Sequence, residues 1–271
     1  MKAVCIYRDE RFSPNSVEVD RAILEAVADR LRRRGCEVAF VREAEMAGSD
    51  GRETLRGADI CFSMARSEQA LQVVRESGVR CINRPEAVQL CSRRSRLDQL
   101  MRSAKVAMPP LAGDKGCWLK RGDGSAERRG DVVFCATEAD ERRAMAVFRE
   151  RGITEVVRSI HVQGDVLKFY GVGDGLLFRY YYPSDDGISK FGDERLNGAA
   201  HHYAFDKVEL QREVRRLARL VGIEVYGGDC VVSSDGSLAI IDFNDWPSFS
   251  RCREEAAEAI GNLLPHSQQN V

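Results

Sequence analysis

The sequence predicts an α/β protein in which a parallel βαβ lobe is followed by lobes of α+β character built on antiparallel strands. Two observations indicate this order. Over residues 1–84, short apolar strands alternate with amphipathic helices, which is typical of a parallel sheet covered by helices on both faces. Near the carboxyl end, two apolar runs flank a Ser-Asp-Gly turn, which is a strong signal for an antiparallel hairpin.

The composition is that of an ordinary globular enzyme, with 271 residues of which 44% are hydrophobic and 31% charged. The 41 basic and 42 acidic residues leave a formal charge of -1, which argues against a nucleic-acid partner. No run approaches the roughly 18 apolar residues of a membrane span, and the N-terminus reads as a strand, so we expect a cytoplasmic protein. The nine cysteines are scattered singly, and we expect reduced thiols in the core.

The first lobe shows a repeated strand-helix-strand pattern. The predicted strands are 3–7, 37–41, 58–64 and 79–83, and the predicted helices are 17–34 and 68–77, closed by Gly35 and Gly78. In parallel sheets ligands gather at the carboxyl ends of the strands, which makes Arg8, Arg66 and Asn83 candidates for a pocket. Exposed loop residues are the alternative for each of them.

The next segment, residues 85–108, predicts a linker helix with an apolar stripe that leads into a short strand at 106–108, stopped by two prolines. A second strand then delivers Lys120 just ahead of a loop that contains Gly122 and Gly124. Glycine lets the backbone N–H groups of such a loop fold over phosphates, and a plain turn is the alternative.

A lysine lies among aromatic residues in the stretch GDVLKFYGVG. Strand alternation from Val166 puts Lys168 and Tyr170 on one face, and Arg179 follows on the next strand after a glycine turn. Removing an ammonium group from water is costly unless an anion compensates for it, so we expect an anion near Lys168. The alternative is that the side chain reaches back to solvent.

The closing hairpin, YGGDCVVSSDGSLAIIDFNDWPSF, collects oxygen ligands. If Asp235 and Gly236 are its two loop residues, Asp229 lies directly opposite Asp242, and Asn244 joins them on the same face. Opposed like charges destabilise a strand pair unless a cation lies between them. Mg²⁺ takes oxygen ligands and is commonly held by one or two carboxylates together with nucleotide phosphates. Each residue alone also fits a turn or cap role, and their convergence favours a metal site.

The order of these parts resembles the ATP-grasp superfamily, most specifically in GDVLKFYGVG and in the closing Gly-x-Asp and Asp-x-Asn-x-x-Pro motifs. The resemblance runs from Asn83 to Phe249, and the first lobe fits the family's N-terminal domain. It implies an ATP-grasp fold in which two antiparallel sheets sandwich ATP. The implied segments are an N-terminal domain (1–84), a linker helix (85–108), a central lobe with the glycine loop (109–162) and a C-terminal lobe with the metal site (163–271).

The resemblance also implies roles for the residues singled out above. Lys120 would contact the α- and β-phosphates beside Gly122 and Gly124, and Asp165 would lie near the ribose hydroxyls. Lys168 and Arg179 would bind the transferred phosphate or the acceptor carboxylate. Asp229, Asp242 and Asn244 would hold one or two Mg²⁺ ions, for which Mn²⁺ can substitute. The chain departs from the family at residues 157–160, where an acidic hinge residue is usual, and at Asp242, where glutamate is more frequent. The shorter aspartate favours a single metal ion.

Most enzymes similar to this chain phosphorylate a carboxylate and let an amine attack the acyl phosphate. The resemblance therefore implies an ATP- and Mg²⁺-dependent ligase for a small carboxylic acid, such as an amino acid or a short peptide, and an amine. His161, His201 and His202 need no catalytic role, although the last two could close on the acceptor or simply lie exposed in a loop. Such enzymes are often homodimers, and the sequence leaves the oligomeric state and both substrates open.

Two other functions remain open. The motif Lys-x-Tyr-x-Val-Gly also resembles ATP-grasp inositol phosphate kinases, but the loop 184–198 sets Lys190 and Arg195 against four acidic residues, which argues against a polyphosphate acceptor. A non-catalytic nucleotide-binding protein is the third alternative. The intact metal ligands and both lysines argue against it.

Overall fold

The computed structural model describes residues 1–13, 16–124, 126, 128–186 and 197–264. The strands are β1 (Lys2–Tyr7), β2 (Glu37–Arg42), β3 (Ile60–Ser63), β4 (Arg80–Ile82), β5 (Cys117–Arg121), β6 (Val132–Cys135), β7 (Val156–Ile160), β8 (Asp165–Val172), β9 (Leu177–Tyr181), β10 (Val225–Val232) and β11 (Leu238–Asp245). The helices are α1 (Val17–Arg33), α2 (Ser49–Leu55), α3 (Glu68–Ser77), α4 (Pro85–Ser92), α5 (Arg94–Ser103), α6 (Glu138–Glu150), α7 (Lys207–Val221) and α8 (Arg253–Gly261).

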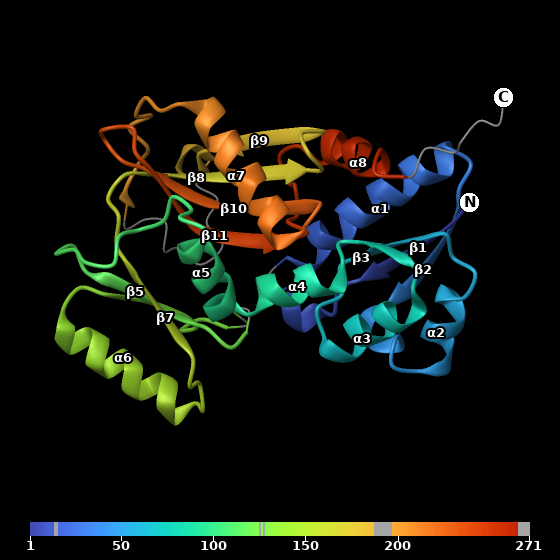
Figure 1. Ribbon diagram of the computed structural model, residues 1–271, viewed down its shortest axis with the longest axis horizontal. Coiled ribbons are helices and arrows are strands. Elements are labelled where there is room, and N and C mark those ends of the chain that lie inside the picture. The colour runs from blue at the N-terminus through green and yellow to red at the C-terminus, as the bar shows by residue number, and fades with distance from the viewer. Residues whose placement is uncertain (14–15, 125, 127, 187–196, 265–271) are drawn as a thin grey trace.

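The strands form three sheets, which confirms the predicted fold class. A parallel sheet in the order β2-β1-β3-β4 comes first, and two antiparallel sheets follow in the orders β6-β5-β7 and β11-β10-β8-β9. Helices α4 and α5 lie in the middle of the molecule, between the parallel sheet and the two antiparallel ones (Figure 1).

Alternating residues of β1 and β3 face two different cores, as expected for a sheet covered on both sides. One face packs against α1, whose apolar stripe Ile23, Leu24, Val27 and Leu31 is buried as predicted. The other face packs against α2 and α3, with Val4 and Ile6 among its buried residues.

The parallel sheet and the C-terminal sheet share one core. The cluster around α1 continues through Trp246 and Phe249 into α8, which lies beside α1 (Figure 1). Arg30 on α1 forms ion pairs with Glu254 and Glu258 on α8. The central sheet instead has a separate small core beneath α6. The first and last parts of the chain therefore form one body, to which the central lobe is attached.

Asn83 joins the two sheets of this body. Its Nδ2 donates to the carbonyl oxygen of Val225 at 2.7 Å, and its Oδ1 accepts from the backbone N–H groups of Glu224 and Val225 at 2.9 and 2.8 Å. The side chain is buried, and both its oxygen and its nitrogen have partners inside the protein. Asn83 thus acts as a link between lobes, where the sequence suggested a pocket residue.

The segment 85–108 differs from its prediction in two ways. It forms two helices, because Arg93, with φ -97° and ψ 83°, ends α4 and starts α5 in a new direction. No strand forms at 106–108. The N–H of Ala107 donates to the Glu213 side chain at 2.9 Å instead of to a neighbouring strand. The segment therefore has one hydrogen bond to β11, from the N–H of Ile240 to the Ala107 carbonyl, and the two prolines that follow have no N–H group to donate.

All nine cysteines are buried, as their apolar contexts predict. Burial raises the pKa of the Cys5 and Cys230 thiols to about 12, so they stay protonated and pack as small apolar side chains. Within the described ranges, no helix is long and apolar enough to cross a membrane.

The link made by Asn83 predicts a large effect on stability. Asn83→Ala removes three hydrogen bonds in a buried place and should lower the free energy of unfolding by about 3 kcal/mol. The control Gln69→Ala, which removes an exposed side-chain amide on α3, should cost less than about 0.5 kcal/mol. Urea denaturation followed by circular dichroism measures both, and equal effects would contradict the assigned role.

Candidate functional site

The register of the β10–β11 hairpin sets up the site. Asp229 lies directly opposite Asp242, as predicted, but the loop and the strand register that lead to this pairing differ from the prediction. The loop is one residue longer than expected, because Val232 pairs with Leu238 and Gly236 (φ +83°) donates to the Ser233 carbonyl. A β-bulge at Ile241 adds one residue to β11 and restores the register beyond it.

Oxygen and nitrogen groups of three neighbouring strands meet at this point. Lys168 on β8 pairs across the sheet with Asp229, and its Nζ lies 3.0 Å from Oδ1 of that carboxylate. The Nδ2 of Asn244 donates to Oδ2 of Asp242 at 2.8 Å. The structure therefore brings together the predicted metal ligands and one of the two predicted lysines.

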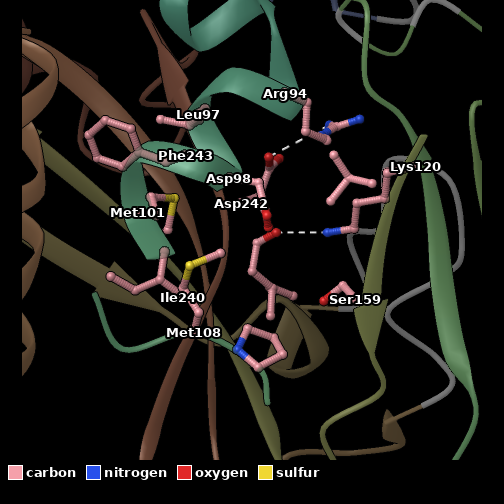
Figure 2. A pocket seen from close by; sticks show the side chains of 13 residues that line it. Arg94, Leu97, Asp98, Met101, Met108, Lys120, Ser159, Ile240, Asp242 and Phe243 are labelled. Carbon is pink, nitrogen blue, oxygen red and sulfur yellow. Dashed lines mark hydrogen bonds and ion pairs between the residues drawn. The ribbon is translucent and has the colours of Figure 1, made fainter. Parts of the chain in front are cut away.

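The second lysine reaches the same place from the central sheet. Lys120 on β5 donates from Nζ to the carbonyl oxygen of Ile241 at 2.7 Å (Figure 2). The bulge frees this carbonyl from the strand ladder, so it can accept a hydrogen bond from outside the sheet. Lys120 therefore links the central lobe to the C-terminal sheet next to Asp242.

Arg94, the first residue of α5, is a site residue that the sequence analysis missed. Its guanidinium lies 3.7 Å from Oδ1 of Asp242 (Figure 2). It also donates to the Arg121 carbonyl at 3.4 Å. The run SRRSR contains several arginines, and nothing in their spacing distinguishes Arg94 from the others. Only the change of direction at Arg93 turns it toward the hairpin.

The charges of this cluster shift one another's pKa values. Burial, together with the nearby Arg94 guanidinium, lowers the pKa of Lys120 to about 8. The Asp229 carboxylate raises the pKa of Lys168. Burial alone would raise the pKa of Asp242, but the nearby Arg94 and Lys120 outweigh it and hold this pKa below its usual range. Lys120, Lys168 and the Asp242 carboxylate are therefore charged at neutral pH.

Gly122 anchors the start of the glycine loop. Its N–H donates to the Glu155 carbonyl at 2.8 Å, and its own carbonyl accepts from the N–H of Ser95 at 3.0 Å. A Cβ at this position would lie 2.9 Å from the Glu155 carbonyl oxygen and 3.2 Å from the Ser95 Cβ. Close packing thus requires glycine here, whereas Gly124 has open space around it apart from the Arg121 side chain.

A pocket lies between the two antiparallel sheets, beside this cluster. Its lining is largely apolar, with Lys120, Arg94 and Asp242 at one end (Figure 2) and Leu97, Met101, Met108, Val157, Ser159, Ile240 and Phe243 around the rest. The pocket has a volume of about 30 Å³ and is partly open to solvent, so in this structure it has room for water molecules only. A molecule the size of a nucleobase would fit only if the two sheets moved apart.

The donor set is suited to Mg²⁺ in combination with phosphates. Two carboxylates and an amide supply hard oxygen atoms on neighbouring strand positions. Within the described residues there is no group of three His, Cys, Asp or Glu side chains placed to hold a metal ion. Three cations, Arg94, Lys120 and Lys168, already face the two carboxylates, so the cluster carries an excess of positive charge. A metal ion fits when phosphates enter with it.

Two predicted residues have other partners in this structure. Both carboxylate oxygens of Asp165 accept backbone N–H groups, from His201 at 2.7 Å and Tyr203 at 2.8 Å, so Asp165 holds the loop that carries the histidines. Arg179 forms an ion pair with Glu255 on α8. Their roles at the ribose and at the transferred phosphate stay predictions.

The rings of His161 and His202 each contact a side chain from another part of the chain. The His202 Nε2 lies 3.3 Å from Asp185 Oδ1, and the His161 Nδ1 accepts from the Trp118 indole at 3.2 Å. Lys190 and Arg195, on which the charge argument about the acceptor loop depended, lie outside the described residues.

No family model and no curated protein matches the sequence. Solved structures match over nearly the whole length. They include the D-alanine–D-alanine ligase from Bacillus anthracis complexed with ATP (11% identity, 96% of each chain covered, TM-score 0.63), a RimK domain ATP-grasp protein from Sphaerobacter thermophilus (15%, 97% of this chain and 98% of that one, 0.65) and the ATP-grasp ligase PsnB complexed with a minimal precursor (14%, 97% and 98%, 0.61). At these identities the likeness concerns the fold, and with the sheet orders and the hairpin described above it shows that this chain has the ATP-grasp fold.

Proposed function

We propose that the protein is an ATP- and Mg²⁺-dependent carboxylate–amine ligase that activates a small carboxylic acid, such as an amino acid or a short peptide. The observation that carries the proposal is the meeting of Lys120, Lys168 and Arg94 with the Asp229–Asp242 pair between two antiparallel sheets. The fold adds support, because the similar solved structures include ligases, one of them complexed with ATP.

The nucleotide site follows from the chemistry of the pocket. Its apolar walls suit a purine base, and the cations at its end suit a triphosphate. Lys120 and Arg94 contact the phosphates nearer the base, since they line the pocket itself. Lys168, farther along the sheet and 38% exposed, contacts the terminal phosphate.

The reaction needs positioned charges rather than a nucleophilic side chain. The substrate carboxylate attacks the γ-phosphorus, the bond to the β-phosphate oxygen breaks, and ADP leaves an acyl phosphate behind. The amine then attacks the carbonyl carbon, a C–N bond forms, and the amine loses a proton as phosphate departs. The lysines and Arg94 stabilise the negative charge on the transferred group. Mg²⁺, held by Asp229, Asp242 and Asn244, would supply further charge neutralisation on the phosphate oxygens.

An assay of product type tests the proposal. The protein is incubated with ATP, Mg²⁺ and a panel of amino acids and small acids, each with and without an added amine. We expect ADP together with a new amide, detected by mass spectrometry. ADP with a stable phosphorylated product would indicate a kinase instead. If none of the acids in the panel leads to ADP release, the proposal is contradicted.

The two carboxylates of the hairpin should be essential. Asp229→Ala and Asp242→Ala should each lower turnover by about 100-fold or more, because each removes a metal ligand. Circular dichroism should show that both variants keep the fold. The control is Asp174→Ala, which removes an exposed carboxylate from the turn between β8 and β9 and should leave turnover unchanged. Retained turnover in both hairpin variants would remove the metal assignment.

The lowered pKa of Lys120 predicts a pH dependence for nucleotide binding. An anion binds the charged ammonium, so ADP affinity should be constant below pH 8 and should fall by about tenfold per pH unit above it, where binding must include proton uptake. Lys120→Arg, whose guanidinium stays charged, should give a flat profile between pH 7 and pH 9.5. Calorimetric titration measures both, and the same decline in the arginine variant would exclude Lys120 as its origin.

A further inference from the structure

A buried ion-pair network lies at the end of β11, directly after the proposed metal ligands. Asp245, the last residue of the strand, is 2% exposed in its side chain, and Arg8 and Arg66 are 6% and 11% exposed. Arg66 donates from Nη2 to Oδ1 of Asp245 at 2.7 Å, and Arg8 donates from Nη2 to Oδ2 at 3.3 Å. Arg8 also donates to Asp20 at 3.2 Å, which balances the charges of the network.

The network holds backbone as well as side chains. Arg66 donates to the backbone carbonyl of Asp245 at 3.3 Å, and Arg8 donates to that of Trp246 at 3.1 Å. Trp246 has a φ of +37°, a conformation that residues other than glycine rarely adopt, so the chain turns sharply there. The two arginines therefore fix the point at which β11 ends.

The arginines are themselves held firmly by the parallel sheet. Glu43, which follows β2 and is buried, accepts the N–H of Asp9 at 2.7 Å and that of Arg66 at 2.8 Å. The backbone beside Arg8 and the backbone of Arg66 are thus tied to one carboxylate at the carboxyl ends of β1, β2 and β3. A fixed support in the first lobe reaches the last strand of the C-terminal sheet.

We infer that Arg8 and Arg66 act through Asp245 as positioning residues for the metal-binding end of β11. This inference rests on the proposed function, since it concerns the same metal site. Asp245 is the neighbour of Asn244, whose amide is bonded to Asp242. Fixing Asp245 therefore fixes the spacing of the two metal ligands on that strand.

The cost of the network supports a positioning role over a purely stabilising one. Buried ion pairs add little stability compared with apolar residues of similar size, because the charges lose their hydration. The network instead fixes the position and orientation of Asp245 at the end of β11. Four hydrogen bonds converge on Asp245 from two rigidly held guanidinium groups, and an apolar contact would leave the strand free to slide or twist.

The test compares ADP binding with and without metal. Calorimetry gives the ADP dissociation constant of the full-length protein in EDTA and in Mn²⁺, and their ratio is the gain in affinity due to the metal. In Asp245→Asn this gain should fall at least tenfold, while binding in EDTA stays within twofold, because Lys120 and Arg94 are untouched. Arg66→Lys, which keeps the charge but loses the bidentate contact with Asp245, should show an intermediate loss of this gain.

Arg30→Gln is the control. It removes the ion pairs between α1 and α8, which also join the first and last lobes but lie away from the hairpin end. It should lower the melting temperature and leave the metal gain unchanged. If Asp245→Asn and Arg66→Lys fold and keep the full metal gain, the network is only structural and the inference is wrong. If the wild-type protein binds no ADP with Mn²⁺, the proposed function fails and the inference falls with it.

Discussion

One extra residue in β11 determines the geometry of the site. Without the bulge at Ile241, the longer hairpin loop would shift Asp242 out of line with Asp229 and onto the opposite face. The same bulge turns the Ile241 carbonyl toward Lys120, so it also makes the contact between the central lobe and the C-terminal sheet. The proposed metal ligands, the position of Lys120 and the pocket all depend on this local irregularity.

The rest of the molecule divides into a rigid support and an attached lobe. The shared core around α1 and α8, the amide of Asn83 and the arginines at Asp245 join the parallel sheet to the C-terminal sheet. The central lobe has its own core, and it meets this support through Lys120 and through the packing of Gly122 on Ser95. Because the central lobe has a core of its own, a movement of this lobe relative to the support would be the simplest way to open the pocket.

Much of this arrangement could be predicted from the sequence, for identifiable reasons. Glycine-closed helices and alternating apolar strands have clear periodicities, and the opposition of Asp229 and Asp242 was predicted correctly. That success depended on two errors that cancel, a loop taken one residue too short and a bulge not foreseen. Ile241 looks like its apolar neighbours, so no residue type marks the bulge. The missed Arg94, and the use of Arg8 and Arg66 to hold Asp245, depend on contacts between residues far apart in the chain.

The contact between Lys120 and the Ile241 carbonyl also bears on which molecules can occupy the pocket. A nucleoside without phosphates must separate the two sheets and leave the ammonium group without its acceptor, a loss of about 1–3 kcal/mol. Under the proposed function, a nucleotide would replace the lost carbonyl with a phosphate oxygen and restore the bond. Adenosine and free adenine would then be poor competitors, and the pocket would favour phosphorylated ligands.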